Sequence, residues 1–215
     1  RFTRRQVGFL TRPEIEALLA TPDQSTWSGR RDYAILLVAV QCGLRLSELT
    51  GVCRMAIFLG TGAHISVLGK GRKERATPLT KETAAVLKAW LCEIPDGADA
   101  IVFPSARGTR LSSDGMEYLL AKHVRTAAKM CPSLANKRVT PHVLRHTTAM
   151  EFLQAGVDRA VIALLLGHES VETTQIYLDA NLAIKQQALA KAAPPSGNAG
   201  RYHPDDQLLA FLKRL

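Results

Sequence analysis

The sequence predicts an α+β fold that is mainly helical and contains one small three-stranded antiparallel sheet. Helical patterning, with apolar residues three and four positions apart, covers most of the 215 residues. It is interrupted between residues 55 and 79 by three short β-prone runs that glycine-rich turns separate. Hydrophobic residues make up 47% of the chain and charged residues 22%, which is typical of a globular domain with a core.

The N-terminal part of the chain predicts three helices. Residues 11–14 read Thr-Arg-Pro-Glu, a capping box with proline in the first turn, so the first helix begins near Thr11. The nearly all-apolar stretch within residues 31–42 predicts a core helix that ends at Gly43, because glycine commonly closes helices. Residues 47–52 continue as a short helix.

The sheet is predicted from three runs that are rich in β-branched and apolar residues. They cover residues 55–59, 64–68 and 75–79. Gly-Thr-Gly at 60–62 joins the first two, and Gly-Lys-Gly-Arg-Lys at 69–73 joins the last two. Such short glycine-rich connections are typical of an antiparallel meander, and the second one forms a basic hairpin tip.

The second half of the chain returns to helical patterning. Four segments carry it: 80–93, 112–130, 141–156 and 158–166. Thr140 and Pro141 are typical of a helix start, and Gly167 is typical of a helix end. A further short helix is predicted at 171–178.

Composition separates the C-terminal end from the preceding domain. Residues 194–204 are rich in Pro, Gly and Ala, which indicates a linker. Residues 205–215 begin with acidic residues, end on Lys213 and Arg214 and carry an apolar stripe, as expected of an amphipathic helix. The sequence therefore predicts a domain over 11–193 and a separate helix over 205–215.

The chain is basic, with 28 Lys and Arg against 19 Asp and Glu and a formal net charge of +9. Clustered basic side chains release counterions from a phosphate backbone, so this charge favours a nucleic acid partner. A merely basic solvated surface is the alternative interpretation.

Two other features narrow the class of protein. Every apolar run is far shorter than the roughly 18 residues of a membrane span, so no membrane partner is expected. The four cysteines are scattered and form no C-x-x-C pair. This pattern is typical of a reducing cytoplasmic compartment rather than of a disulfide-linked secreted domain.

Two segments place basic side chains at turns. In GLRLSEL, Arg45 and Glu48 are three positions apart at a helix start, so the carboxylate can orient the guanidinium or simply form a surface ion pair. The hairpin GKGRKER carries four basic residues: Lys70, Arg72, Lys73 and Arg75. Its glycines allow the backbone to approach a phosphate closely, and a solubilising turn is the alternative.

Two further segments add histidine, arginine and tyrosine. In TPHVLRHT, His142 and Arg145 begin a helix, whose N-terminus favours an anion. The spacing of His142 and His146 can bind zinc, but the hydrolytic zinc motif needs glutamate where this chain has valine, so no metal is predicted. His168 follows Leu-Gly, and Tyr177 lies nine residues later, where a tyrosine is also typical of a core residue.

Taken together, the four segments resemble the tyrosine recombinase (phage integrase) family over about residues 10–189. The catalytic domain of that family carries, in the same order, GLR-x-SEL, a GKG-x-KER hairpin, H-x-x-RHT, and LGH followed nine residues later by tyrosine. The resemblance implies six catalytic residues: Arg45, Lys70, His142, Arg145, His168 and Tyr177. It also implies the fold of a tyrosine recombinase catalytic domain.

The resemblance implies a role for each of these residues. Tyr177 would be the nucleophile, and Arg45 and Arg145 would bind the scissile phosphate. Lys70 would protonate the leaving 5′ oxygen, with Lys73 as the alternative acid. Two guanidinium groups can stabilise the negative charge that the phosphate gains during attack, so the chemistry needs neither a metal nor another cofactor.

The remaining residues would complete the pocket and contact DNA. His142 and His168 would line the pocket, and Glu48 would support the first arginine. Three residues of the hairpin are expected to contact the DNA backbone: Arg72, Lys73 and Arg75.

The implied protein is a site-specific DNA recombinase or integrase that works through a 3′-phosphotyrosyl intermediate. It would act on double-stranded DNA as a tetramer on two duplexes, in the cytoplasm and at the nucleoid. Residues 1–10 would be a linker from a preceding N-terminal DNA-binding domain, and residues 205–215 a helix exchanged between subunits. A type IB topoisomerase-like relaxing enzyme and a non-catalytic DNA-binding relative are the alternatives.

Overall fold

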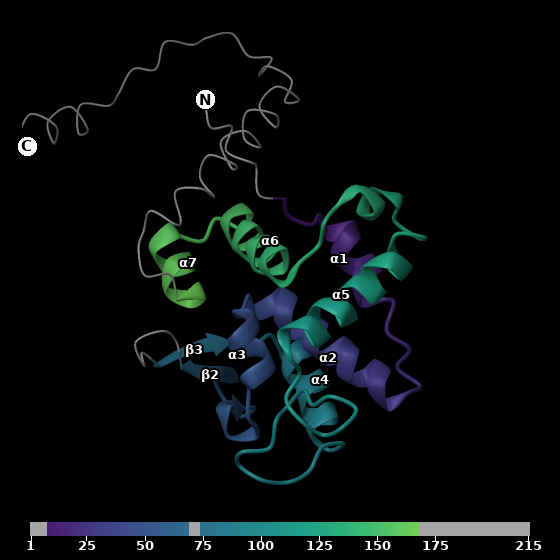
Figure 1. Cartoon of the computed structure of the whole chain (residues 1–215). Coiled ribbons are helices and arrows are strands. Elements are labelled where there is room, and N and C mark those ends of the chain that lie inside the picture. The colour runs from purple at the N-terminus through teal and green to yellow at the C-terminus, as the bar shows by residue number, and fades with distance from the viewer. Residues whose placement is uncertain (1–7, 69–73, 168–215) are drawn as a thin grey trace, which may run out of the picture. The chain divides into compact units, whose positions relative to one another are not determined.

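A computed structural model describes residues 8–68 and 74–167 (Figure 1). Its α-helices are α1 (Arg12–Leu19), α2 (Trp27–Cys42), α3 (Leu46–Gly51), α4 (Lys81–Leu91), α5 (Ser113–Ala127), α6 (Pro141–Gln154) and α7 (Arg159–Leu166). The strands are β1 (Ile57–Phe58), β2 (His64–Leu68) and β3 (Glu74–Pro78), and two 3-10 helices are η1 (Arg54–Ala56) and η3 (Pro132–Asn136). The predicted class, mainly helical with one small antiparallel sheet, is confirmed.

Helix α2 lies in the centre of the helical core and packs against α1, α4 and α6. Residues 34–40 are buried on every face of the helix, as their nearly uninterrupted apolar sequence predicts. The helix begins at Trp27, four residues earlier than predicted, because the Thr26 hydroxyl accepts a hydrogen bond from the Gly29 backbone N–H.

The end of α2 is held close to α6 and α7. Gly43 closes α2 in the left-handed conformation with φ 57°. A Cβ atom at this position would lie 2.7 Å from the Leu166 side chain and 3.1 Å from the Thr148 Cβ. Glycine is therefore required both by the backbone and by the close approach of two other helices.

The sheet has the order β1-β2-β3, with both pairs antiparallel. Ile65 and Val67 of β2 are buried, and Arg75 of β3 stands directly opposite Val67. Directly opposed residues project from the same face, so Arg75 shares the face of a buried valine. Helix α7 packs against β3 (Figure 1).

Strand β1 is shorter than the predicted run at 55–59. Residues 54–56 form η1 instead, because the backbone N–H groups of Arg54 and Met55 bond to the carbonyls of Ala100 and Ala98. Residues 54 and 55 therefore pair with the segment between α4 and α5, and β1 begins only at Ile57.

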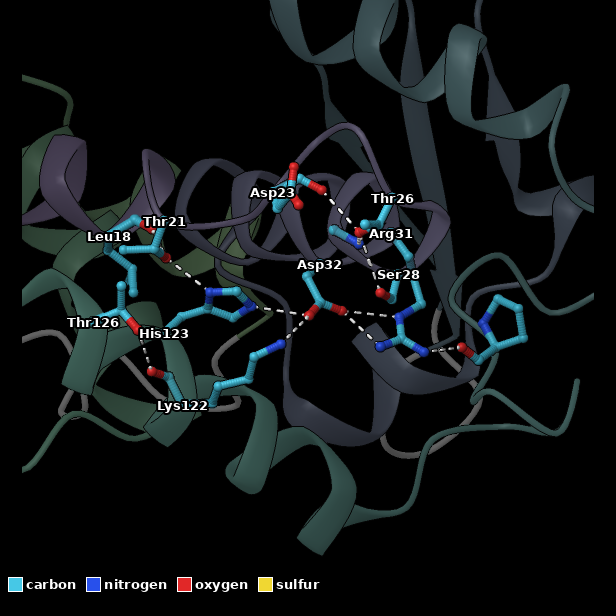
Figure 2. Close-up of polar contacts among 12 residues, drawn as sticks. Leu18, Thr21, Asp23, Thr26, Ser28, Arg31, Asp32, Lys122, His123 and Thr126 are labelled. Carbon is cyan, nitrogen blue, oxygen red and sulfur yellow. Dashed lines mark hydrogen bonds and ion pairs between the residues drawn. The ribbon is translucent and has the colours of Figure 1, made fainter.

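A buried polar network joins α2 to α5 (Figure 2). Asp32 accepts two hydrogen bonds from the neighbouring Arg31 and lies 2.9 Å from Nε2 of His123, whose Nδ1 lies 2.8 Å from the Thr21 hydroxyl. Burial by itself raises the pKa of Asp32, but the hydrogen bonds from His123 and Arg31 lower it below its ordinary value. The network therefore keeps a charged carboxylate inside the helical core.

Several predicted segments lie outside the described residues, namely the helices at 171–178 and 205–215, the linker at 194–204 and most of residues 1–10. Within 8–68 and 74–167, each helix is too short or too polar to cross a membrane.

Candidate active site

Arg45 stands at the start of α3, directly after the turn that ends α2. Its backbone is extended, with φ −64° and ψ 152°, and its N–H donates a 2.8 Å hydrogen bond to the carboxylate of Glu48. The same carboxylate accepts a 2.9 Å hydrogen bond from Nη1 of the Arg45 side chain. Because Glu48 lies three residues after Arg45 at a helix start, its carboxylate can accept hydrogen bonds from both the backbone N–H and the guanidinium of Arg45.

The Glu48 carboxylate also binds Arg75 of β3 with both of its oxygens. Nη1 and Nη2 of Arg75 donate to Oε1 and Oε2 at 2.9 and 2.7 Å. Burial alone raises the pKa of Glu48, but the hydrogen bonds from Arg75 and Arg45 outweigh it and lower this pKa to about 2. Glu48 is therefore a buried, charged carboxylate shared by two arginines.

Arg145 approaches the same region from α6. Thr140 caps this helix by accepting a hydrogen bond from the Val143 N–H, and Pro141 occupies its first turn, as predicted. The Arg145 side chain is buried and donates from Nη1 to the Gly43 carbonyl at 2.7 Å and from Nη2 to the Leu166 carbonyl at 2.5 Å. It therefore ties the end of α2 to the end of α7.

Three arginines meet at the C-terminus of α7. Arg75 donates from Nε to the Leu165 carbonyl at 3.2 Å, Arg145 binds the next carbonyl along the chain, and Arg45 donates from Nη2 to the Gly167 carbonyl. The carbonyls at a helix C-terminus have no partner within the helix and carry partial negative charge. Three positive side chains from α3, β3 and α6 thus converge on one helix end.

Gly167 allows Arg75 to take part in this convergence. It closes α7 in the left-handed conformation with φ 66°. A Cβ atom here would lie 2.9 Å from Nη1 of Arg75 and 3.1 Å from its Cζ. The predicted helix-ending glycine therefore also allows the Arg75 guanidinium to lie against the backbone.

His142 lies in the first turn of α6 and is exposed. Its ring meets the ring of His146 edge-on, with centroids 4.3 Å apart. The part of the chain that the structure describes contains no group of three or more His, Cys, Asp or Glu side chains arranged to hold a metal ion.

Five of the predicted site residues lie outside the described residues: Lys70, Arg72, Lys73, His168 and Tyr177. The structure brings Arg45, Glu48 and Arg145 to one place, around the end of α7.

Arg75, which the sequence predicts as a DNA contact of the hairpin, lies in β3. Its side chain is only 11% exposed and its guanidinium is turned toward Glu48 and α7, because it projects from the buried face of the sheet.

Sequence reasoning did not find the backbone carbonyls that these arginines bind. The acceptors belong to Gly43, Leu165, Leu166 and Gly167. The two glycines were identifiable as helix ends, but nothing local indicates which side chains would reach them. Carbonyl acceptors are present at every residue, so only packing can select these four.

Residues 8–183 match the model of the Phage integrase family. A protein of Sinorhizobium fredii named as an integrase/recombinase (y4rC) is 66% identical over 215 residues, which is 100% of this chain and 65% of that protein. Tyrosine recombinase XerD of Pseudomonas putida is 35% identical over 190 residues, 86% of this chain and 61% of that protein. The chain thus spans less than two thirds of the length of these relatives.

Solved structures resemble the fold as well. The crystal structure of XerA recombinase aligns with a TM-score of 0.72 at 28% identity, covering 90% of this chain and 67% of that one. The XerH site-specific recombinase, bound to its palindromic difH substrate in a post-cleavage complex, aligns with a TM-score of 0.74 at 25% identity, covering 87% and 54%. By its sequence motifs, its fold and these relatives, the chain belongs to the phage integrase family of tyrosine recombinases.

Proposed function

We propose that this chain is the catalytic part of a site-specific DNA recombinase or integrase, which cleaves and rejoins DNA through a 3′-phosphotyrosyl intermediate. The observation that carries this proposal is the convergence of Arg45 and Arg145 on the end of α7. The chain continues from that helix to His168 and Tyr177. Family membership supports the same reaction class.

The two arginines suit a scissile phosphate. A phosphodiester under attack gains negative charge on its non-bridging oxygens, and guanidinium groups held in advance stabilise that charge without reorganisation. The Arg45 side chain remains 34% exposed while Glu48 holds it in place. Among the described residues only Glu48 and Gly167 accept its side-chain hydrogen bonds, so further N–H groups of Arg45 can point to an anion.

The other proposed residues carry out the nucleophilic attack and the two proton transfers of the reaction. The Tyr177 hydroxyl attacks phosphorus, its proton passes to a nearby base such as His142, and Lys70 donates a proton to the departing 5′ oxygen. The phosphotyrosyl ester keeps the energy of the broken bond, so the reverse attack by a 5′ hydroxyl reseals the DNA without a nucleotide. His168 completes the pocket.

A recombinase is favoured over a DNA-relaxing enzyme because the similar proteins are named as recombinases. The similar XerH structure is a complex with its DNA substrate, which supports double-stranded DNA as the partner here. We further propose that the protein assembles as a tetramer on two duplexes at the nucleoid, with its hairpin residues Arg72 and Lys73 on the DNA backbone.

Covalent capture of DNA tests the proposed function. The protein is expressed in bacteria, cells are lysed in detergent, and DNA attached to the protein is recovered and sequenced. The wild-type protein should yield one enriched sequence, and Tyr177→Phe should yield none. Tyr118→Phe is the matched control, because Tyr118 is 73% exposed on α5 and should keep the adduct. An adduct formed by Tyr177→Phe would exclude this nucleophile.

The recovered sequence then separates the two enzyme classes. Supercoiled plasmids carrying one or two copies are incubated with the protein in the absence of ATP. Deletion or inversion between two copies is expected of a recombinase. A ladder of relaxed topoisomers without exchanged segments would instead identify a relaxing enzyme.

A further inference from the structure

Arg75 has more constrained surroundings than Arg45, one of the two arginines proposed to bind phosphate. Its side chain is 11% exposed, against 34% for Arg45. Its Nη1 and Nη2 bind both oxygens of Glu48, and its Nε binds the Leu165 carbonyl. All three nitrogens of its guanidinium thus donate to protein atoms, which suits Arg75 to hold Glu48 and the end of α7 in place.

The two partners of Arg75 belong to two different elements of the proposed site, α3 and α7. Glu48 holds the Arg45 guanidinium and backbone, while the Leu165 carbonyl belongs to the last turn of α7, which leads along the chain to His168. Arg75 therefore connects Glu48, which holds Arg45, to the last turn of α7. The chain continues from this helix to His168 and the proposed nucleophile Tyr177.

Charge and shape both favour this link. Without Arg75, the buried Glu48 carboxylate would have Arg45 as its remaining ion-pair partner among the described residues, and a buried charge that loses a partner is strongly destabilised. The Arg75 guanidinium also lies against Gly167, where a Cβ atom would come within 2.9 Å of Nη1. A side chain at position 167 would therefore push the Arg75 guanidinium away from this helix end.

We propose that Arg75 is a positioning residue for the cleavage reaction, which fixes Arg45 through Glu48 and fixes the end of α7 through the Leu165 carbonyl. This inference rests on the proposed function, since it assumes that Arg45 binds the scissile phosphate. It gives Arg75 a role other than the DNA contact that the hairpin sequence indicates.

The test compares Arg75→Gln and Arg75→Lys with Arg31→Gln. Arg31 is a matched control because its side chain is also 11% exposed and binds a carboxylate and a carbonyl, those of Asp32 and Pro104 (Figure 2). None of these partners belongs to α3, β3 or α7. Arg31→Gln should lower the stability in the same way without changing the arrangement around Arg45.

Single-turnover cleavage is measured at saturating DNA on a nicked substrate that carries the captured sequence, and DNA affinity is measured separately. Arg75→Gln should lower the cleavage rate roughly tenfold or more, the effect of removing the hydrogen-bonded support of a functional group. Its DNA affinity should stay near that of the wild type. Arg75→Lys should rescue little, because one ammonium cannot span both Glu48 oxygens and the Leu165 carbonyl. Arg31→Gln should cleave at the wild-type rate.

Cleavage by Arg75→Gln at the wild-type rate would overturn the proposal, and so would an equal loss of rate in Arg31→Gln. A loss of DNA affinity with an unchanged rate at saturation would instead restore Arg75 as a DNA contact. A double variant with Glu48→Gln adds a coupling test: its rate should resemble that of the slower single variant, because both changes break one link.

Hydrogen exchange gives a second readout that does not depend on activity. Backbone amides at the end of α7 should exchange faster in Arg75→Lys than in the wild type, and Arg31→Gln should leave them unchanged. Unchanged exchange in Arg75→Lys would refute the link to α7. If the wild type forms no DNA adduct, the proposed function fails, while this measurement still decides whether Arg75 holds the helix end.

Discussion

Replacement of Glu48 by Gln should test how much the ion pairs of Glu48 contribute to stability and to DNA cleavage. The carboxylate binds Arg45 and Arg75 and is only 6% exposed. A glutamine keeps the shape but removes the charge and one of the two oxygen acceptors, so the buried Arg75 loses its bidentate partner. We expect a large loss of unfolding free energy together with slower DNA cleavage.

The size of the effect follows from the pKa of Glu48, which falls from 4.5 to about 2 in the folded protein. At about 1.4 kcal/mol per pKa unit, the fold favours the charged form by about 3 kcal/mol. Because the folded pKa is the lower one, this stabilisation is complete above about pH 5 and is lost as the pH falls through about 2. Glu48→Gln should therefore cost about 3 kcal/mol at pH 7 and less at pH 3, which lies between the two pKa values.

Urea unfolding at pH 7 and pH 3 measures the loss, with Glu14→Gln as the matched control. Glu14 is also buried, accepts 2.6 Å hydrogen bonds from Lys137 and Ser133, and has a pKa of about 2 because these bonds outweigh its burial. Both variants should lose similar stability, but only Glu48→Gln should slow cleavage by the folded protein.

Two results would refute this reasoning. One is a Glu48→Gln protein whose unfolding free energy at pH 7 lies within about 1 kcal/mol of the wild type, since that would make the ion pairs energetically minor. The other is an equal loss of cleavage in Glu14→Gln, because that would trace the effect to general stability.

Four further predictions concern the reaction, the helix ends and the assembly. Arg45→Ala should slow single-turnover cleavage by roughly 100- to 1000-fold, as for the loss of one charge-stabilising donor, with DNA affinity in a gel-shift assay nearly unchanged; an unchanged rate would remove it from the site. Lys70→Ala should be inactive on ordinary DNA and regain cleavage on a 5′-bridging phosphorothiolate, whose sulfur departs without needing a proton; failure of that rescue would argue against an acid role. Gly167→Ala should lower the melting temperature more than Gly108→Ala, because both have positive φ but only Gly167 has a side chain against its Cβ position, and equal shifts would contradict the close contact. Deletion of residues 205–215 should impair cooperative assembly on DNA more than folding, because the helix that the sequence predicts there, about 11 residues with an apolar stripe, would be marginal alone and would need a host surface; wild-type cooperativity in the truncated protein would exclude docking on a neighbouring subunit.

The sequence by itself determined the features that depend on neighbouring residues. The capping box at Thr11, the start of α6 at Thr140 and the glycine ends of α2 and α7 are local hydrogen-bonding patterns, and the structure contains each of them. The contact between Arg45 and Glu48 is also local, because residues three positions apart at a helix start lie side by side. The ordered motifs also indicated the family.

Only the tertiary structure decided which groups these residues meet. Glu48 and Arg75 are 27 residues apart, and Arg45 and the Gly167 carbonyl are 122 apart, so no local pattern relates them. The sequence places Arg75 in a basic hairpin and predicts a DNA contact, but its register opposite Val67 turns its side chain toward the protein. The start of the first predicted strand was likewise lost to hydrogen bonds with residues 98 and 100. Local sequence sets caps and periodicity, whereas buried ion pairs form only where packed elements bring a charge and its acceptor together and exclude water.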